Sequence, residues 1–220
     1  MAELAHNGAC HSRLVRNCVA FCAVQHNIQG MDTARLLTPT ELGSYRDHLL
    51  RLRAEDRRLR FGAPLGDAAI AAFVARISPW DARIIARLDH RLAVIAAVQI
   101  TVVGGPLAEL AFTVDEAERG LGLGTALMRR ALLWARNRNV LRACMYCLAE
   151  NQAVRRMARR VGMSVSTYAG DSEGEVALPR PTALSIAREF GAEQAGLLDY
   201  LLKTGLASAT PDAPRLQLQP

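Results

Sequence analysis

Lysine is almost missing from this 220-residue chain: of its 27 basic residues only Lys203 is lysine, and the others are arginine. Aromatic residues are also scarce, at 5%, which leaves no cluster of stacking side chains of the kind that binds single-stranded nucleic acid. No apolar run reaches the roughly eighteen residues that a membrane-spanning helix needs. Since half of the residues are hydrophobic, we expect instead one soluble domain with an ample core.

Cysteine is present in an odd number, five, without the spacing of a disulfide framework. This favours a reducing, cytoplasmic location. Cys144 and Cys147 fall in an expected strand, where residues three apart face opposite sides, so they are a poor metal pair and are expected in the core. Cys18, Cys22 and His26 share a helical face, but chance explains such a group better than zinc does. The sequence therefore predicts no metal site.

The most informative stretch runs from residue 107 to residue 125 and reads LAELAFTVDEAERGLGLGT. Residues 107–114 are apolar with β-branched and aromatic members, which predicts a buried strand. After an acidic turn, glycines alternate at Gly120, Gly122 and Gly124 and lead into a helix pattern. Such glycines let the backbone approach a bulky anion, and the amides at a helix start carry partial positive charge. The stretch therefore predicts a phosphate cradle.

Three kinds of phosphate loop use glycine in this way. A Walker A loop needs Gly-Lys-Ser/Thr, but no lysine precedes Thr125. A dinucleotide fingerprint needs a third glycine where Thr125 stands. The third kind is the pyrophosphate loop of the GCN5-related N-acetyltransferases (GNAT), Arg/Gln-x-x-Gly-x-Gly/Ala, which Arg119-x-x-Gly122-x-Gly124 matches at every fixed position. A glycine-rich loop without a ligand is the alternative interpretation.

The resemblance to the GNAT family covers about Ala34 to Leu178. It implies an α/β fold, the GNAT acyl-CoA N-acyltransferase fold, with a mixed, mostly antiparallel sheet flanked by helices. Glu150-Asn151 with Gly162-Met163 resembles the second conserved segment of the family. Within the family, Ala108-Glu109, the glycine loop and Glu150-Asn151 together are similar to the bacterial protein-lysine acetyltransferase domains.

The chain divides into four parts by composition and pattern. We expect an extension over residues 1–30 that is disordered or a mis-called start, a GNAT domain over 31–180, a C-terminal helix over 181–203 and a disordered tail over 204–220. Periodicity predicts helices and strands inside the domain. The expected helices are 39–58, 67–77, 121–137 and 151–161; the expected strands are 34–38, 83–88, 92–103, 107–114, 140–148, 163–168 and, after a turn at 171–174, 175–178.

The resemblance also implies the co-substrate and the residues that hold it. Acetyl-CoA would be the acetyl donor, so the chain would be an acyltransferase. Backbone amides of residues 112–114 would hold the pantetheine arm and polarise the thioester carbonyl, the loop would bind the pyrophosphate, and Asn151 would bond the arm or simply cap its helix. The predicted cofactor-binding set is Phe112, Thr113, Val114, Arg119, Gly120, Leu121, Gly122, Leu123, Gly124, Thr125 and Asn151.

Glu109 is the predicted catalytic residue. It is a lone acid in an apolar strand, and burial would favour its neutral form, which suits a general base for an ammonium substrate. The alternative is a structural ion pair with an arginine. Many family members protonate the leaving thiolate with a tyrosine, and Ala158 holds that position here. Because a free thiol has a pKa of about 8.5, it leaves tolerably well without an acid, and the identity of any acid stays open.

The acceptor is the least determined part of the prediction. We lean towards a protein lysine, because the pattern resembles the protein-acetylating subgroup and no second acidic cluster stands near Glu109 in the sequence. A small-molecule amine acceptor and a non-catalytic acyl-CoA-binding regulatory module are the alternatives. Residues 119–160 hold ten arginines and one acid, a charge of +9 that leaves −3 for the rest of the +6 chain. Nucleic acid is a rival partner for this segment, but it lacks a recognition motif. Whether the chain is a monomer or a homodimer stays open.

Overall fold

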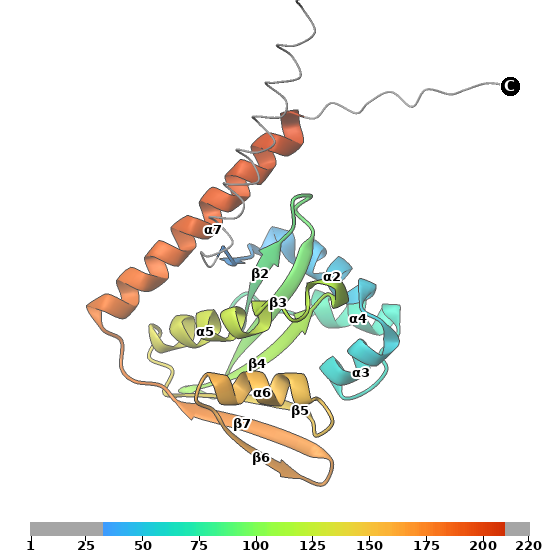
Figure 1. Ribbon diagram of the computed structural model, residues 1–220, viewed down its shortest axis with the longest axis vertical. Coiled ribbons are helices and arrows are strands. Elements are labelled where there is room, and N and C mark those ends of the chain that lie inside the picture. The colour runs from blue at the N-terminus through green and yellow to red at the C-terminus, as the bar shows by residue number, and fades with distance from the viewer. Residues whose placement is uncertain (1–32, 210–220) are drawn as a thin grey trace, which may run out of the picture.

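The computed structural model describes residues 33–209, which form a seven-stranded sheet with helices on both faces (Figure 1). The predicted extension over 1–30, with Cys18, Cys22 and His26, lies outside the described residues. The elements in chain order are β1 (Arg35–Leu36), the 3-10 helix η1 (Pro39–Glu41), α2 (Leu42–Arg51), α3 (Ala54–Phe61), α4 (Asp67–Ala75), β2 (Ala82–Leu88), β3 (Val94–Val103), β4 (Leu107–Val114), the 3-10 helix η2 (Glu116–Glu118), α5 (Leu123–Arg136), β5 (Arg142–Leu148), α6 (Gln152–Arg160), β6 (Ser164–Tyr168), β7 (Asp171–Ala177) and α7 (Ala183–Ala209).

The sheet has the strand order β1-β2-β3-β4-β5-β7-β6, and every neighbouring pair is antiparallel except β4 and β5. This confirms the predicted mixed, mostly antiparallel α/β architecture. The parallel pair is joined by α5, as parallel strands require a crossover. Its ladder begins at Leu107 with Arg142 and ends at Glu109 with Cys144. Beyond that point the two strands diverge, and this divergence positions the candidate site.

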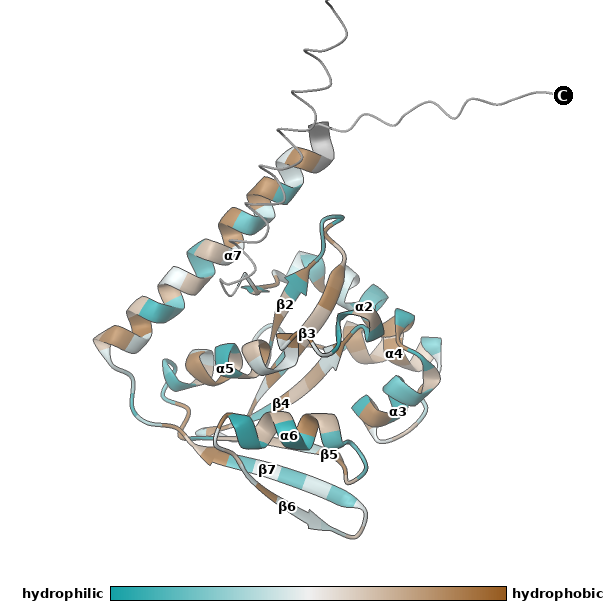
Figure 2. Ribbon diagram, in the orientation of Figure 1, coloured by the Kyte–Doolittle hydropathy of each residue, from teal (hydrophilic) through white to brown (hydrophobic). Residues whose placement is uncertain are grey.

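Two apolar cores fill the two sides of the sheet. One lies under α5 and α6 and includes Leu110 and Leu127. The other lies under α2 and α4 and includes Tyr45 and Ile70. Both faces of the central strand β3 are therefore covered, and β3 is mostly hydrophobic along its length, as strands buried on both faces are (Figure 2).

The first predicted helix, 39–58, is wrong as a single element. The chain leaves the helical conformation at Leu52 and Arg53, whose ψ angles are 139° and 158°, and α3 then begins with Glu55 and Asp56 in its first turn. A break of this kind frees carbonyl groups at the end of α2. Arg57 satisfies them, because its guanidinium donates to the carbonyls of Leu50 at 2.5 Å and Leu52 at 3.0 Å.

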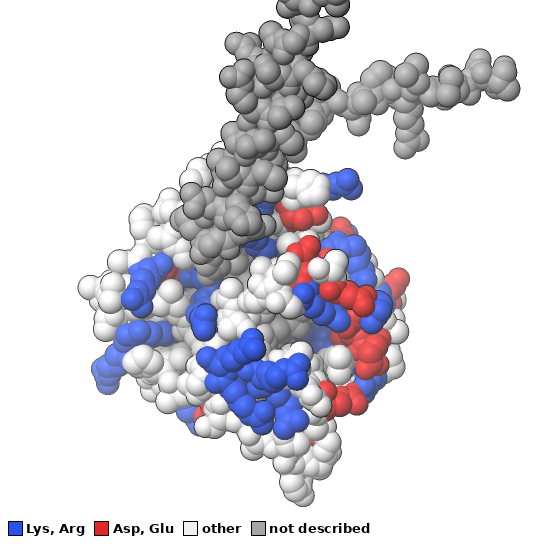
Figure 3. All heavy atoms as spheres, viewed as in Figure 1, with Lys and Arg blue, Asp and Glu red and all other residues white. Residues whose placement is uncertain are grey.

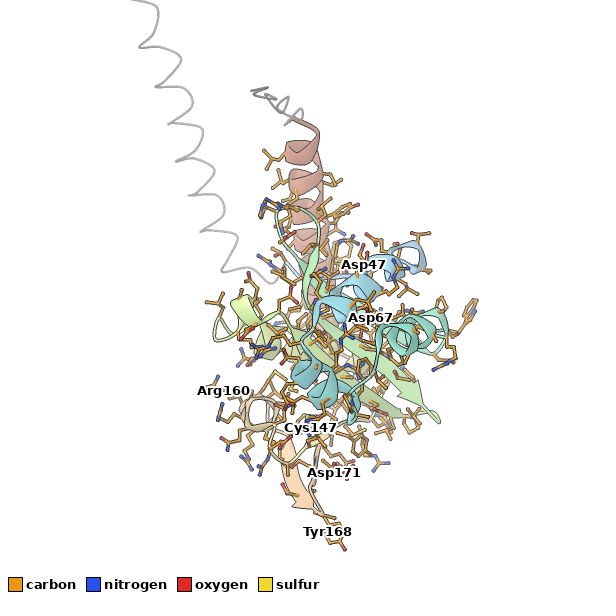
Figure 4. The ribbon with its side chains drawn as sticks, turned by 90° about the vertical axis from the view of Figure 1, so that its right-hand side faces the viewer. Asp47, Asp67, Cys147, Arg160, Tyr168 and Asp171 are labelled. Carbon is orange, nitrogen blue, oxygen red and sulfur yellow. The ribbon has the colours of Figure 1, made fainter. Side chains whose placement is uncertain are left out.

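The predicted turn at 171–174 is also wrong, because these residues belong to β7. The chain reverses at Ala169 and Gly170, which have φ angles of 49° and 92°, between the paired residues Tyr168 and Asp171. Gly174 serves packing instead: a Cβ there would lie 3.2 Å from Met145. Tyr168 and Asp171 consequently lie at the free end of the β6–β7 hairpin (Figure 4).

The C-terminal helix is longer than predicted. α7 runs to Ala209, so residues 204–209 are helical rather than part of a disordered tail, and residues 210–220 lie outside the described part. α7 packs against β1 and α5 and continues beyond them (Figure 1). Despite this length, none of the described helices combines the size and apolar character that crossing a membrane would require.

Candidate active site

A cavity of about 490 Å³ opens where β4 and β5 part. Its walls come from α3, the diverging halves of β4 and β5, residues 118–125 and α6. Past the Glu109–Cys144 pair, β4 and β5 no longer hydrogen-bond to each other, so the facing edges of Leu110–Val114 and Met145–Cys147 line the cavity with strand backbone. Such an edge can pair with an extended ligand that carries amide groups.

The glycine loop forms one end of the cavity and leads into α5. Gly122 caps the helix with a φ of 83°, which an L side chain rarely adopts, and it offers no side chain to accept the first amides. The N–H groups of Leu123, Gly124 and Thr125 have no intrahelical acceptor at their positions and lie beside the cavity. A Cβ at Gly124 would lie 2.8 Å from the sulfur of Met157 on α6, so glycine also lets the two helices close on the loop.

Arg119, the first residue of the motif, is held by the protein itself. Its guanidinium contacts Asp56 of α3 at 2.7 Å and donates to the carbonyl of Val114 at 3.2 and 3.3 Å. Asp56 is largely buried, with 11% of its side chain exposed. Arg119 therefore fastens the glycine loop to α3 and to the end of β4. Any contact with a bound phosphate would come in addition to this structural role.

Asn151 lies across the cavity at the start of α6. Its side-chain oxygen accepts the backbone N–H of Val154 at 3.3 Å, so it caps the helix. It also lines the cavity, and its amide nitrogen stays available to donate. Every residue of the predicted cofactor-binding set lines the cavity except Leu121, whose side chain is 69% exposed at the outside of the loop.

Glu109 lies at the apex, as the last β4 residue that pairs with β5. It is half-buried rather than fully buried, so its desolvation is less than the sequence suggested. It is next to the wall residues Leu110 and Ala111 without being part of the wall. No arginine, lysine or histidine of the described residues forms a salt bridge with Glu109. This removes the support for the alternative of a structural ion pair.

A buried histidine holds the far end of β4, and sequence analysis did not single it out. His48 of α2 is fully buried; its Nε2 lies 2.8 Å from the hydroxyl of Thr113, and its Nδ1 lies 3.0 Å from Asp115. Arg51 contacts the other oxygen of Asp115 at 3.3 Å. Burial alone would raise the pKa of Asp115, but the His48 contact and the charge of Arg51 together lower it. These contacts fix the strand end just before the glycine loop.

Sequence reasoning missed Tyr146, Glu173 and Glu175, because only strand pairing brings these three residues to the face that carries Glu109. In register, Cys144 of β5 lies opposite Glu109 and also opposite Glu175 of β7, and Tyr146 lies opposite Glu173. Paired residues share a face of the sheet, so Glu109, Tyr146, Glu173 and Glu175 lie on one face, which we call the acidic face. No second acidic cluster stands near Glu109 in the sequence, but the fold places two distant acids on the same face of the sheet.

Tyr146 is the tyrosine on this face that also lines the cavity. A hydrogen bond to Glu173, followed by the charge of nearby groups, raises the pKa of Tyr146 to about 12. A phenol with that pKa is a weaker acid than a thiol with a pKa of about 8.5. Tyr146 is therefore poorly suited to protonate a leaving thiolate. Ala158, at the position where the acid was expected, is fully buried and packs beside Gly174.

The rim of the cavity is charged with opposite signs on its two sides. An arginine patch covers α6 and consists of the exposed residues Arg156, Arg159 and Arg160; carboxylates gather across the hollow, towards α2 and α3 (Figure 3). Arg156 and Arg160 also line the cavity. In the side view, Arg160 lies on the α6 side and the buried Cys147 lies inside (Figure 4). Burial raises the pKa of the Cys147 thiol, so this cavity residue is not an activated nucleophile.

Residues 36–163 match the model of the acetyltransferase (GNAT) family. The chain belongs to this family. It is accordingly an N-acetyltransferase that uses acetyl-CoA as co-substrate, and the residues of the cavity fit that role. The backbone N–H groups at the start of α5, which have no intrahelical acceptor, suit a pyrophosphate. The unpaired strand edges suit the amide groups of a pantetheine arm.

Solved structures show the same fold. The GNAT domain of S. lividans PAT superimposes with a TM-score of 0.58 and 22% identity, over 66% of this chain and 89% of that one. Spermidine N-acetyltransferase from Vibrio cholerae, solved with CoA and spermine, gives a TM-score of 0.54 and 15% identity, over 66% and 94%. None of the curated proteins matches the sequence.

Proposed function

We propose that this GNAT enzyme transfers the acetyl group of acetyl-CoA to a lysine side chain of a protein, with Glu109 as general base. The observation that carries the proposal is the position of Glu109 at the apex where β4 and β5 separate. A carboxylate there belongs to the acidic face, which is suited to a cation, at the point where that face meets the strand edges suited to the donor. No salt bridge from a described residue neutralises it, so it is available to take a proton from an ammonium group.

The acidic face supports a cationic acceptor. Glu173 and Glu175 lie on β7, separated from Glu109 by the intervening strand β5, and Glu175 also pairs with Arg142 at 3.1 Å. In the described structure, α2, α3 and α4 make their main contacts with elements other than β7. An acceptor could approach there without crossing the arginine patch on α6, which is better matched to an anionic donor. Removal of the ammonium proton by Glu109 would free the amine to attack the thioester carbonyl. The C–S bond of the tetrahedral intermediate would then break, and the extra proton on the new amide nitrogen would pass to solvent or to the departing thiolate.

A second candidate acceptor is a polyamine. Several carboxylates on one face would suit a molecule with several cationic groups, and the Vibrio cholerae structure named above is a spermidine N-acetyltransferase. A lysine in a basic stretch of a protein presents the same chemistry. The lysine proposal rests on the resemblance of the Glu109, glycine-loop and Asn151 pattern to protein-acetylating domains, and the fold of the S. lividans PAT domain agrees with it.

The test of Glu109 compares Glu109→Gln with Glu116→Gln, an exposed glutamate of η2 that is paired with Arg53. Glu109→Gln should keep the acetyl-CoA affinity and lower kcat by about two to four orders of magnitude, the usual contribution of a general base. Glu116→Gln should keep both. If Glu109→Gln turns over at a near wild-type rate at neutral pH, Glu109 is structural and another base must act. If neither the wild type nor any variant turns over, the module is a non-catalytic acyl-CoA binder.

A further inference from the structure

The long helix α7 buries polar residues and exposes apolar ones, which is the reverse of an ordinary surface helix. Ser185, Asp199 and Lys203 on its inner side are buried, whereas its outer side is apolar. Apolar residues recur along the whole length of α7, alternating with polar ones (Figure 2). They are between 43% and 65% exposed and comprise Leu184, Ile186, Phe190, Leu197, Leu198, Leu201, Leu202 and Leu206. We call this set the α7 outer face.

Polar contacts fix this orientation. Arg130 of α5, almost fully buried, pairs with Glu193, and Glu189 accepts from Arg138 at 2.6 Å. Further along, the ammonium group of Lys203 lies 2.5 Å from Asp199 and donates to the carbonyl of Leu88 at 2.7 Å. Rolling the helix to bury its leucines would separate the buried Arg130 from Glu193 and the Lys203 ammonium group from the Leu88 carbonyl. A buried ion left without its partner costs several kcal/mol. The outer face must therefore be covered from outside.

The outer face is larger and less charged than a monomer surface usually is. Between residues 184 and 206 of α7, Arg188 is the one charged residue among the positions that are exposed in the described structure. Eight apolar side chains, each about half exposed, lie along a helix of about 40 Å. Together they make an apolar surface at or above the upper end of the roughly 300–600 Å² that is the largest patch on a typical monomer. A stable interface needs about 800 Å² from each partner, which a surface of this length can supply.

We propose that the partner is a second copy of this chain, and that the two α7 helices pack antiparallel through their outer faces. A two-fold interface needs a patch that matches itself, and one straight apolar helix meets this condition. Gly191, about one turn from Ala195 at the middle of α7, has open space where a Cβ would be, so the backbones can approach closely there. The interface is independent of the acceptor and of Glu109.

Charge decides the direction and argues against a membrane. A parallel pair would bring the two Arg188 side chains together, whereas an antiparallel pair centred near Ala195 separates them by about 20 Å, beyond the Debye length of about 10 Å. A helix that lies on a membrane needs a basic polar side. The polar side of α7 carries Glu189, Glu193 and Asp199 and is turned towards the domain.

Sedimentation of the full chain tests the interface. The wild type should have twice the monomer mass, and Leu198→Glu and Leu201→Glu should each weaken the dimer by about 100-fold or more, because each buries a charge without a partner. Leu141→Glu is the matched control: Leu141 is 49% exposed and precedes β5, so it is not part of the α7 outer face. It should leave the dimer intact. All variants should keep the thermal shift with acetyl-CoA, which reports a folded domain and separates this result from the enzymatic proposal.

A cross-link in an otherwise wild-type chain covers the case in which a charged variant fails to fold. Gln194→Cys, near the middle of α7, should give a disulfide-linked dimer on mild oxidation, whereas Leu206→Cys, near one end, should give far less. The wild type sets the background from its own cysteines. Equal linking at both positions would overturn the antiparallel arrangement. A wild type that stays monomeric, with the outer face covered by residues 1–32 or bound to lipid vesicles, would overturn the dimer.

Discussion

The loop glycine Gly122 combines two properties that a substitution can separate. Its φ of 83° is unfavourable for any residue with a Cβ, and its position places a side chain at the start of α5 beside the cavity. Gly122→Ala should cost roughly 1 to 2 kcal/mol of stability for the backbone strain. It should also weaken acetyl-CoA binding by about tenfold or more, equivalent to about 1.4 kcal/mol.

Gly170→Ala is the control for that substitution. Gly170 has a similar φ of 92° and open space around it, but it lies at the β6–β7 turn away from the cavity. Thermal unfolding with and without acetyl-CoA should show similar losses of melting temperature in both variants. Only Gly122→Ala should lose the shift that the ligand produces. An undiminished shift in Gly122→Ala would contradict the phosphate cradle.

A second prediction concerns Asp115 and the pH dependence of the unfolding free energy. The folded-state pKa of Asp115 is held low by His48 and Arg51 against the opposing effect of burial. In the unfolded chain the Asp115 carboxylate has its ordinary pKa of about 3.9 and therefore binds a proton more readily than in the folded chain. The contribution of Asp115 to stability is thus present above about pH 4 and is lost as the pH falls through the lower pKa of the folded state.

The variant Asp115→Asn should remove that contribution. It should be less stable than the wild type at pH 7, and the two urea-unfolding curves should converge as the pH falls towards about 2. Asp47→Asn is the control, because Asp47 is 56% exposed and its ion pair is with its exposed neighbour Arg46 rather than with a buried group. Its stability should follow the wild type at every pH. A constant difference between Asp115→Asn and the wild type across the acid range would show that the carboxylate acts through its shape alone.

Lys203 anchors the C-terminal half of α7 to the domain by donating to the carbonyl of Leu88, and Asp199, one turn earlier on the same helix, supplies its counter-charge. Burial lowers the pKa of Lys203, while Asp199 opposes that effect. Lys203→Met should reduce the unfolding free energy by about 3 kcal/mol, since Asp199 would stay buried without its cation. Combining it with Asp199→Leu should recover most of the loss. Urea unfolding measures both, and a double variant no more stable than the single one would show that the pair is not the source.

Elements with a local signal were predictable from the sequence, and elements shaped by distant contacts were not. β4 and the start of α5 follow from a contiguous pattern of apolar residues and glycines. The break after α2 has no glycine or proline; it depends on Arg57, which satisfies the carbonyls that the break exposes. Gly174 suggested a turn, but its small size is needed against Met145.

The same division applies to the site as a whole. The donor side is read from one segment because the glycine loop and β4 adjoin in sequence. The proposed acceptor side is not, because Glu109, Tyr146 and Glu173 come to one face of the sheet only through the register of three strands. The molecule thus separates an arginine patch on α6 from an acidic face on β4 and β7. An anionic donor and a cationic acceptor are expected to enter from different sides.

The protein-lysine proposal is testable because the enzyme itself offers almost no target. Its one lysine, Lys203, is 7% exposed and bonded to Asp199 and Leu88, so self-acetylation of a lysine side chain should not occur in the folded state. Mass spectrometry of candidate proteins incubated with enzyme and acetyl-CoA should therefore show modified lysines that come only from the candidates. Glu109→Gln should reduce them to the level of uncatalysed acetylation. If Glu109→Gln modifies the lysines as much as the wild type does, the modification is uncatalysed and the proposal fails. If spermidine is acetylated faster than any protein, the acidic face binds polyamines instead.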